Sequence, residues 1–471
     1  MNNKTPFKHP GRIALACAVL LALGGCAGVG PTYQRPAVDT PVAFKEGRGE
    51  WVGAVPADTL ERGPWWQLFN DPVLNELAAR VDVSNQNVAA AVAAYAQARA
   101  LVAVQRAWLF PTVSLDAGTS RSGGGGDTPT RKSYQIGIGG SWEPDVWGRL
   151  SRGIDGARAG EQASLADLQA AKLSAQGELA INYFNLRQLD SQRALQAATI
   201  EGYERTLKIA QNRYNAGIVA RTDLLQAQTQ LANAQAEQLG LERQRAVLEH
   251  AIAVLIGQAP ANFTLAPRPV WEGVVPDIPF DIPSTLLQRR PDIAAAERRA
   301  AAANEQIGVA QAALYPSIRL SGNVGLSAAS IGDLFSASAL AWSLGASLAQ
   351  SIFDGGANLA RVDSARAALD AAAARYRQTV LSAFQDVEDQ LVAARILQQQ
   401  LVLRQQAAQA ANLVEQQVLN RYQAGQVSYT EVVTAQATAQ NARRAVVQAQ
   451  SDRQVAAVAL IQAVGGGWRG L

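Results

Sequence analysis

The sequence contains one segment twice. Residues 213–228 read "RYNAGIVARTDLLQAQ", and residues 421–436 read "RYQAGQVSYTEVVTAQ", 208 residues later. Two further pairs recur 205 residues apart: "NVAAA" (87–91) with "DIAAA" (292–296), and "LFPTVSLDAG" (109–118) with "LYPSIRLSGN" (314–323). Such similar offsets indicate two structural repeats, 70–257 and 284–465, produced by duplication. Each repeat is expected to run helix, strand, loop, strand, very long helix, turn, helix.

The longest predicted elements are two helices, 150–214 and 357–422. Neither contains proline, and at 1.5 Å per residue each would be about 100 Å long. Apolar residues step by three and four, which predicts a coiled-coil seam: Ile200, Tyr203, Leu207, Ala210 and Tyr214 in the first helix, and Val380, Phe384, Val387, Leu391 and Ala394 in the second. Return helices are expected at 222–256 and 430–464.

The repeated motif itself is interpreted as the tip of a helical hairpin. Gly217 and Gly425 stand where a helix end requires the left-handed conformation that glycine tolerates. The pairs Thr222-Asp223 and Thr430-Glu431 would then supply a capping side chain and an acid to the next helix. Ser428 with Glu431 has the spacing of a capping box.

Four short segments alternate apolar with small or polar residues and predict β-strands at 112–120, 133–142, 316–326 and 340–350. Their lengths suit tilted membrane-spanning strands. Aromatic residues suited to the membrane interface lie in or beside these segments: Trp108, Phe110, Trp142, Trp147, Tyr315, Trp342 and Phe353. The alternative is a pair of water-exposed hairpins that cap a soluble coiled coil.

A membrane location would require several copies of the chain. Four strands cannot close a barrel, and an open sheet edge leaves backbone groups unpaired in hydrocarbon. The smallest membrane barrels have eight strands. The protein would therefore be an obligate homo-oligomer, and three copies would give twelve strands above a ring of helices.

The N-terminus has the pattern of a lipoprotein signal peptide. Residues 1–25 comprise a basic stretch, the apolar "IALACAVLLAL" and small residues, and "LGGC" (23–26) resembles a lipobox that would leave Cys26 to be acylated. Alternatively, Cys26 is an incidental thiol behind an ordinary secretory signal. Removing the leader takes away three of 42 basic residues, so that 39 bases balance 39 acids. This composition gives no support for nucleic-acid binding.

Candidate catalytic and metal-binding side chains are few. The mature chain would keep a single cysteine, Cys26, and a single histidine, His250. It has no Cys/His cluster, no Ser/His/Asp set and no phosphate-binding glycine loop. The sequence therefore favours a protein that is not an enzyme, with no metal and no cofactor beyond the lipid on Cys26.

Several motifs together resemble the TolC-like outer-membrane factor family, in its OprM/NodT-type efflux lipoprotein branch. They are "PTYQRP" (31–36), "WWQLFNDPVLNEL" (65–77), "LFP" (109–111), "WEPDVWGRL" (142–150), "RYNAG" (213–217), "PSTLLQRRPDIAAAE" (283–297), "LYPSIRLSG" (314–322), "SIFDGG" (351–356) and "RYQAG" (421–425). The resemblance covers essentially the whole mature chain.

The resemblance implies a mainly α fold with a membrane β-barrel. Each protomer would hold four strands and two long plus four shorter helices. Three protomers would form a 12-stranded barrel in the outer membrane of a Gram-negative bacterium, on a 12-helix α-barrel in the periplasm. Residues 26–70 would be a lipidated extended segment, 258–283 an equatorial linker and 466–471 a tail. The implied function is the exit duct of a tripartite efflux pump, with a periplasmic adaptor and an inner-membrane transporter as partners.

The resemblance also implies a closed periplasmic tip, and its candidate residues are Thr222, Asp223, Tyr422 and Glu431. Relatives commonly carry an Asp one turn after the Glu431 position, where this chain has Thr434. The alternative for the acids is that they only stabilise helix N-termini. The alternative for the whole protein is a non-conducting lipoprotein scaffold or adhesin made of helical hairpins.

Overall fold

The computed structural model describes residues 28–38, 44–46, 63–124, 130–271, 273–276 and 290–466. The leader and Cys26 lie outside the described residues, and so do parts of the predicted extended segment and linker. The chain divides into two compact units. The first unit comprises the described residues of 1–37, 94–165 and 295–377, and it contains the strands with the helix segments next to them. The second unit comprises the described residues of 38–93, 166–294 and 378–471.

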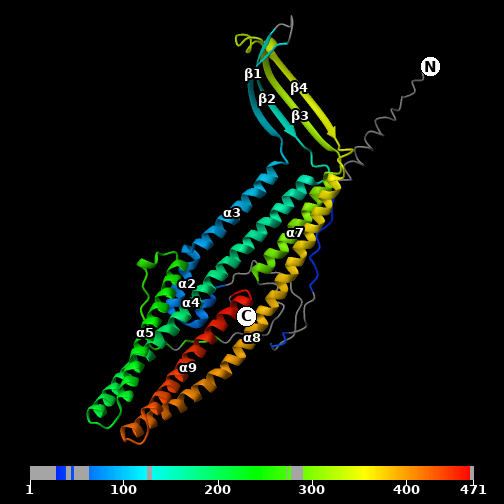
Figure 1. Ribbon diagram of the computed structural model, residues 1–471. Coiled ribbons are helices and arrows are strands. Elements are labelled where there is room, and N and C mark those ends of the chain that lie inside the picture. The colour runs from blue at the N-terminus through cyan, green and yellow to red at the C-terminus, as the bar shows by residue number, and fades with distance from the viewer. Residues whose placement is uncertain are drawn as a thin grey trace, which may run out of the picture. The chain divides into compact units, whose positions relative to one another are not determined.

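The first unit holds one four-stranded sheet (Figure 1). Its strands are β1 (Thr112–Ser122), β2 (Arg131–Trp142), β3 (Ser317–Ala328) and β4 (Leu340–Ala349), with a short 3-10 turn, η3 (Ala337–Ala339), before the last. All neighbours pair antiparallel in the order β1-β2-β3-β4. Each strand lies where the alternation predicts one and differs from the predicted bounds by at most two residues.

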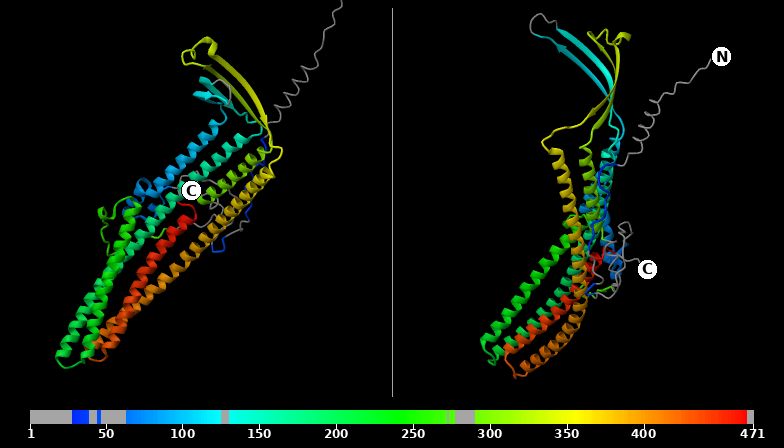
Figure 2. Two further views of the ribbon diagram at one scale, coloured as in Figure 1. Left: turned by 45° about the horizontal axis from the view of Figure 1, so that its top comes forward. Right: turned by 90° about the vertical axis from the view of Figure 1, so that its right-hand side faces the viewer.

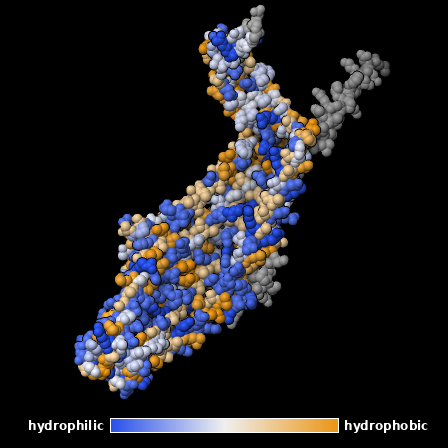
Figure 3. Space-filling view, in the orientation of Figure 1, coloured by the Kyte–Doolittle hydropathy of each residue, from blue (hydrophilic) through white to orange (hydrophobic). Residues whose placement is uncertain are grey.

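The register places apolar side chains on one face of the sheet. Leu115 pairs with Ile138, Ile138 with Val324, and Val324 with Trp342, so these four residues form one row across all strands. The opposite face carries small and polar residues, among them Ser114, Asp116, Gln135, Asn323 and Ser343. Figure 3 shows pale colours of weakly polar residues over much of the sheet. A sheet with one apolar face needs an apolar medium or partner on that side.

The helices repeat the spacing found in the sequence. Helices α3 (Gln86–Ala107) and α7 (Pro291–Ala312) both have 22 residues and begin 205 residues apart. The long helices α4 (Arg149–Asn215) and α8 (Ala357–Gln423) both have 67 residues, 208 residues apart. Return helices α5 (Arg221–Leu255) and α9 (Tyr429–Ala463) both have 35. The three extra residues of the second repeat therefore lie between its first strand and its long helix.

The first repeat contains one helix more than the sequence predicted. Helix α2 (Pro72–Ser84) follows the 3-10 turn η1 (Trp65–Phe69) and precedes α3, where a single helix was expected. Asn85 separates them because it adopts an extended conformation. Its side-chain oxygen accepts from the amides of Asn87 and Val88, and its Nδ2 donates to the Leu255 carbonyl at 2.8 Å. The two helices thus meet at a cap fixed to the end of α5.

The second unit contains a buried array of charged side chains. Asp190 accepts from Arg187 at 2.9 Å and from Arg245 at 2.7 Å, and the Asp190 side chain is fully buried. The same arginines donate to the carbonyls of Ala266 and Leu265, in the segment that follows α5 and the 3-10 turn η2 (Pro260–Asn262). The array therefore joins α4, α5 and this returning segment in one place.

The motif "PTYQRP" is tied to α4 and α7 within the first unit. The Tyr33 hydroxyl donates to the Glu297 carboxylate at 2.8 Å. The Pro31 carbonyl accepts from Arg152 and from Asn304, both at 3.1 Å. Burial and the neighbouring Glu297 carboxylate raise the pKa of Tyr33, which keeps its hydroxyl a donor. These contacts explain why an extended segment is ordered without any secondary structure of its own.

The buried array predicts a large difference between two acid substitutions. Asp190→Ala leaves two arginines without their carboxylate in a buried site, and should lower the free energy of unfolding by about 3–5 kcal/mol. Glu242→Ala removes an exposed partner of Arg193 and should cost less than about 1 kcal/mol. Chemical unfolding followed by circular dichroism of the helices measures both. Equal losses would contradict the assignment of Asp190 as the central anion.

Candidate functional site

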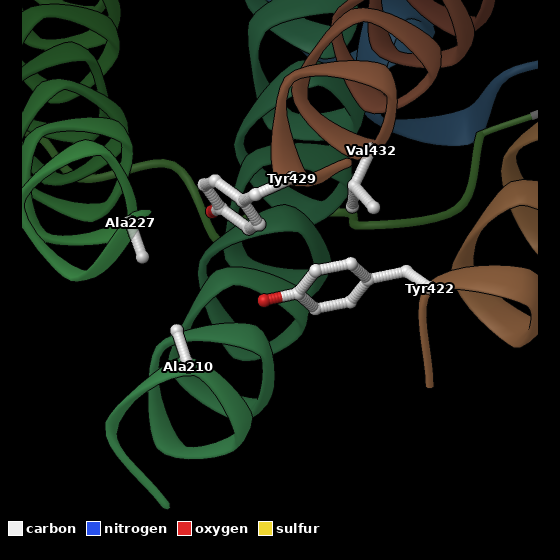
Figure 4. Packing of buried hydrophobic residues seen from close by; sticks show 5 residues of the cluster. All are labelled: Ala210, Ala227, Tyr422, Tyr429 and Val432. Atoms are coloured by element: carbon white, nitrogen blue, oxygen red, sulfur yellow. The ribbon is translucent and has the colours of Figure 1, made fainter. Parts of the chain in front are cut away.

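The turns after α4 and after α8 lie side by side at one end of the second unit (Figures 1 and 2). Five buried residues join them, and we call these the tip cluster: Ala210, Ala227, Tyr422, Tyr429 and Val432. They come from α4, α5, α8 and α9 (Figure 4). The two hairpins that the sequence repeat predicts are therefore held together at their ends by one small core.

Both turns have the same backbone geometry. Gly217 has φ of 70° and Gly425 has φ of 76°, which confirms the left-handed conformation expected at these glycines. The Gly217 amide donates to the Tyr214 carbonyl, and the next amide donates to the Arg213 carbonyl. The second turn repeats both bonds, with the Gly425 amide on Tyr422. This pattern is the Schellman motif, in which the paired amides satisfy the last carbonyls of the helix.

The starts of the return helices differ from each other. Helix α5 begins at Arg221 with Ala220 as its cap residue and no side-chain cap, so the prediction that Thr222 caps it is wrong. Thr430 likewise lies inside α9, because Ser428 is the cap residue there. The capping box of Ser428 and Glu431 is confirmed, with the Glu431 carboxylate accepting from the Ser428 amide at 3.5 Å.

The two repeat-related tyrosines have different environments. Tyr422 is 1% exposed, whereas Tyr214, which was predicted to lie in the helix seam, is 38% exposed in the single protomer. The ring of Tyr422 lies 5.5 Å from that of Tyr429, and its hydroxyl points toward α4 (Figure 4). The position equivalent to Tyr429 in the first repeat holds the exposed Arg221. Tyr214 therefore lacks the aromatic neighbour that helps to bury Tyr422.

Arg213 links the two hairpins, and sequence reasoning missed it. Its guanidinium lies 4.9 Å above the ring of Tyr422, and it donates to the Tyr422 carbonyl at 2.5 Å. A cation over an aromatic ring and a charged bond to a carbonyl both favour this contact. The pair "RY" in both copies of the motif was the available signal. The equivalent Arg421 is exposed.

The predicted polar residues of the tip lie next to this cluster. Thr222 and Glu431 are exposed, and Asp223 is half-buried in the first turn of α5. The Thr434 hydroxyl donates to the carbonyl of Thr430 at 2.9 Å, within its own helix. The structure thus brings Tyr422 into the cluster and places Asp223 and Glu431 at the first turns of the two return helices, where a helix dipole favours negative charge.

The predicted interface aromatics fall into two groups. Trp108, Phe110, Trp342 and Phe353 have exposed side chains, with Phe353 90% exposed. Trp147 is instead half-buried, because it stacks on Tyr315 at 4.9 Å and donates to the Pro316 carbonyl at 2.7 Å. The Trp142 indole donates to the Leu109 carbonyl at 2.9 Å. These contacts fix the junctions between strands and helices, a role that the sequence pattern did not indicate.

The sheet has two unpaired edges. Strand β1 has 11 residues and β4 has 10, all of them exposed, and each strand has one neighbour in the sheet. The apolar face between these edges is exposed as well, with Leu115 70%, Trp342 73% and Leu344 81% exposed. Exposed edges of this length are templates for pairing with another chain.

Comparisons with known proteins identify the same organisation elsewhere. The sequence profile of the outer membrane efflux protein family matches residues 77–258 and 282–466. Outer membrane protein OprJ of Pseudomonas aeruginosa is 30% identical over 461 residues, which cover 96% of this chain and 95% of OprJ. Cation efflux system protein CusC of Escherichia coli is 28% identical, covering 97% of this chain and 98% of CusC. The solved structure of the outer-membrane channel OprN superposes with a TM-score of 0.83 at 31% identity, covering 94% of this chain and all of OprN.

The tip cluster predicts an alkaline titration. Burial, with the neighbouring Tyr422, raises the pKa of Tyr429 to about 12, and burial raises that of Tyr422. Unfolded tyrosines ionise near pH 10. The tip packing should therefore be unaffected below about pH 10 and lose stability as the pH rises toward 12. The tyrosinate absorbance of the native protein minus that of Tyr429→Phe should have its midpoint near 12; a midpoint near 10 would contradict the burial.

Proposed function

The chain belongs to the outer membrane efflux protein family, and we propose that three copies of it form a closed duct with a regulated tip. The protein is an outer-membrane channel of an efflux pump and extends into the periplasm. Its family membership favours this function over a non-conducting scaffold. The observation that supports an assembly of several copies is the sheet with one apolar face and two unpaired edges.

The unpaired edges require more than one copy of the chain. Each unpaired backbone group in hydrocarbon costs several kcal/mol, so β1 of one copy must pair with β4 of another. Because each copy contributes an even number of antiparallel strands, β1 and β4 run in opposite directions. The pair formed by β1 of one copy and β4 of the next is therefore antiparallel as well. Two copies would give the smallest known kind of membrane barrel, and three give the twelve strands that leave room for an open lumen.

The helices support the same assembly. Helix α3 exposes Val92, Leu101 and Val104, and α8 exposes Leu359, Leu403 and Leu413, each by 48% or more. Apolar side chains on the surface of long helices are normally covered by a partner helix. In a trimer, the outer helices of one copy can pack against those of the next and bury these residues.

The partners of the duct are a periplasmic adaptor and an inner-membrane pump. The family supplies the outer-membrane part of efflux pumps. In the proposed assembly, the inner-membrane partner supplies the energy for transport. The duct itself then needs no cofactor. Cys26, which lies outside the described residues, would carry the covalent lipid that adds an anchor in the outer membrane.

The tip is the proposed gate. Tyr422 lies within the tip cluster, and Thr222, Asp223 and Glu431 lie in the first turns of the two return helices that contribute to it. A three-fold axis would bring three copies of Asp223 and Glu431 together, which makes six carboxylates around one opening. Such a ring attracts cations and repels anions. Arg213 holds the two hairpins of each protomer together, so its contact with Tyr422 would oppose separation of the hairpins.

The trimer predicts detergent dependence. When the acyl chains are removed by the Cys26→Ser substitution in a variant with a cleavable secretory leader, the protein should still require detergent and should migrate as a trimer before heating. The reason is that the apolar face of the sheet remains after the lipid is gone. A monomer that stays dissolved in detergent-free buffer would overturn the barrel.

The gate predicts a change in ion selectivity. Asp223→Ala with Glu431→Ala should lower the cation preference of single channels in planar bilayers by about threefold or more, because the carboxylates at the opening are lost. A control with Glu201→Ala and Asp363→Ala removes the same charge at exposed positions away from the turns. If the two double variants behave alike, Asp223 and Glu431 only stabilise helix ends.

A further inference from the structure

Two bases face each other at the loop end of the first hairpin. The register places Arg121 of β1 directly opposite Lys132 of β2, and both are exposed. Like charges in this position repel and destabilise the strand pair. Among the described residues, neither side chain has an ion-pair or hydrogen-bond partner. An anion bound between the two side chains would remove this repulsion. We call it the basic rung.

The basic rung lies on the apolar face of the sheet. Opposite residues of a strand pair share a face, and faces alternate along each strand. Arg121 therefore shares its face with Thr119 and Leu115, and Lys132 shares it with Tyr134 and Ile138. This is the side that lipid covers in a closed barrel, because the other side carries the polar residues. Arg131, next to Lys132 in sequence, lies on that polar face, opposite Ser122.

The basic rung also lies at the height of lipid headgroups. Trp142, at the helix end of β2, and Lys132 are ten residues apart. At a rise of 3.3 Å per residue, they are separated by about 33 Å along the strand. With a strand tilt of about 40° this becomes roughly 25 Å, the height of the apolar band of an outer-membrane barrel. Figure 3 shows a hydrophilic (blue) patch at the loop end of the sheet.

The leaflet follows from the topology. All four strands join their helices at the same end of the sheet, through Thr112, Trp142, Ser317 and Ala349. These helices extend into the periplasm, so the basic rung lies at the outer surface. The other hairpin carries no lysine or arginine between residues 327 and 340, and each copy therefore has one such rung. The outer leaflet at this depth consists of glycolipids whose sugar headgroup carries phosphates.

We propose that Arg121 and Lys132 bind a phosphate of an outer-leaflet glycolipid of the lipopolysaccharide type. The guanidinium can hold two phosphate oxygens at once, and the ammonium adds a second charge from the facing strand. The neighbouring apolar rows, with Leu115 and Ile138, contact the acyl chains of the same lipid. The proposal rests on the membrane barrel of the proposed function and is independent of the tip.

The test measures binding of fluorescent bisphosphorylated lipid A to the detergent-solubilised full-length protein by anisotropy. Arg121→Gln with Lys132→Gln should weaken binding roughly ten- to thirtyfold, since each basic residue near an anionic surface contributes about a factor of five. Arg121→Lys with Lys132→Arg keeps both charges and should bind within about twofold of the native protein. Arg131→Gln is the matched control: it removes one charge from the same hairpin on the polar face.

Each outcome decides the proposal. It is overturned if the Gln double variant binds as tightly as the native protein, or if Arg131→Gln loses as much as Arg121→Gln alone. It is also overturned if millimolar inorganic phosphate displaces the probe as well as unlabelled lipid A does, or if dephosphorylated lipid A competes equally. If the unheated double variant does not migrate as a trimer, the single variants Arg121→Gln and Lys132→Gln are measured in its place. A separate conductance measurement on the native protein in planar bilayers shows whether it forms a membrane barrel, independently of lipid binding.

Discussion

The backbone groups along the free sides of β1 and β4 are the constraint on which the rest of the structure depends. A sheet with an apolar face can enter a bilayer only when these groups have partners, and one chain cannot supply them. Association between copies is therefore a condition for membrane insertion.

Much of this organisation could be predicted from the sequence, because the signals are local. Absence of proline over 67 residues, alternation with a period of two, and glycine at each tight turn act within a few neighbours. The duplication strengthened each assignment, since a pattern at residue 112 could be checked at residue 317. For this reason helix and strand bounds agree within two residues for the strands and within one for the long and return helices.

The features that could not be predicted depend on which distant side chains meet. Asp190 and Arg245 are 55 residues apart, and no pattern marks them as partners. Tyr214 and Tyr422 stand in nearly identical motifs, yet only Tyr422 has a tyrosine from the next helix beside it. The pairing of Arg121 with Lys132 required the exact alignment of one strand on its neighbour. Composition and periodicity contain none of this information.

The arms of the two repeats have equal lengths, 67 residues outward and 35 residues back in each. In the proposed trimer, six arms of the same length would end in one plane and form a level rim. A protein that docks there could use the same contact six times around the opening. Removing two helical turns from a single repeat would leave three notches about 11 Å deep, and the seal against such a ring would be lost at every second arm.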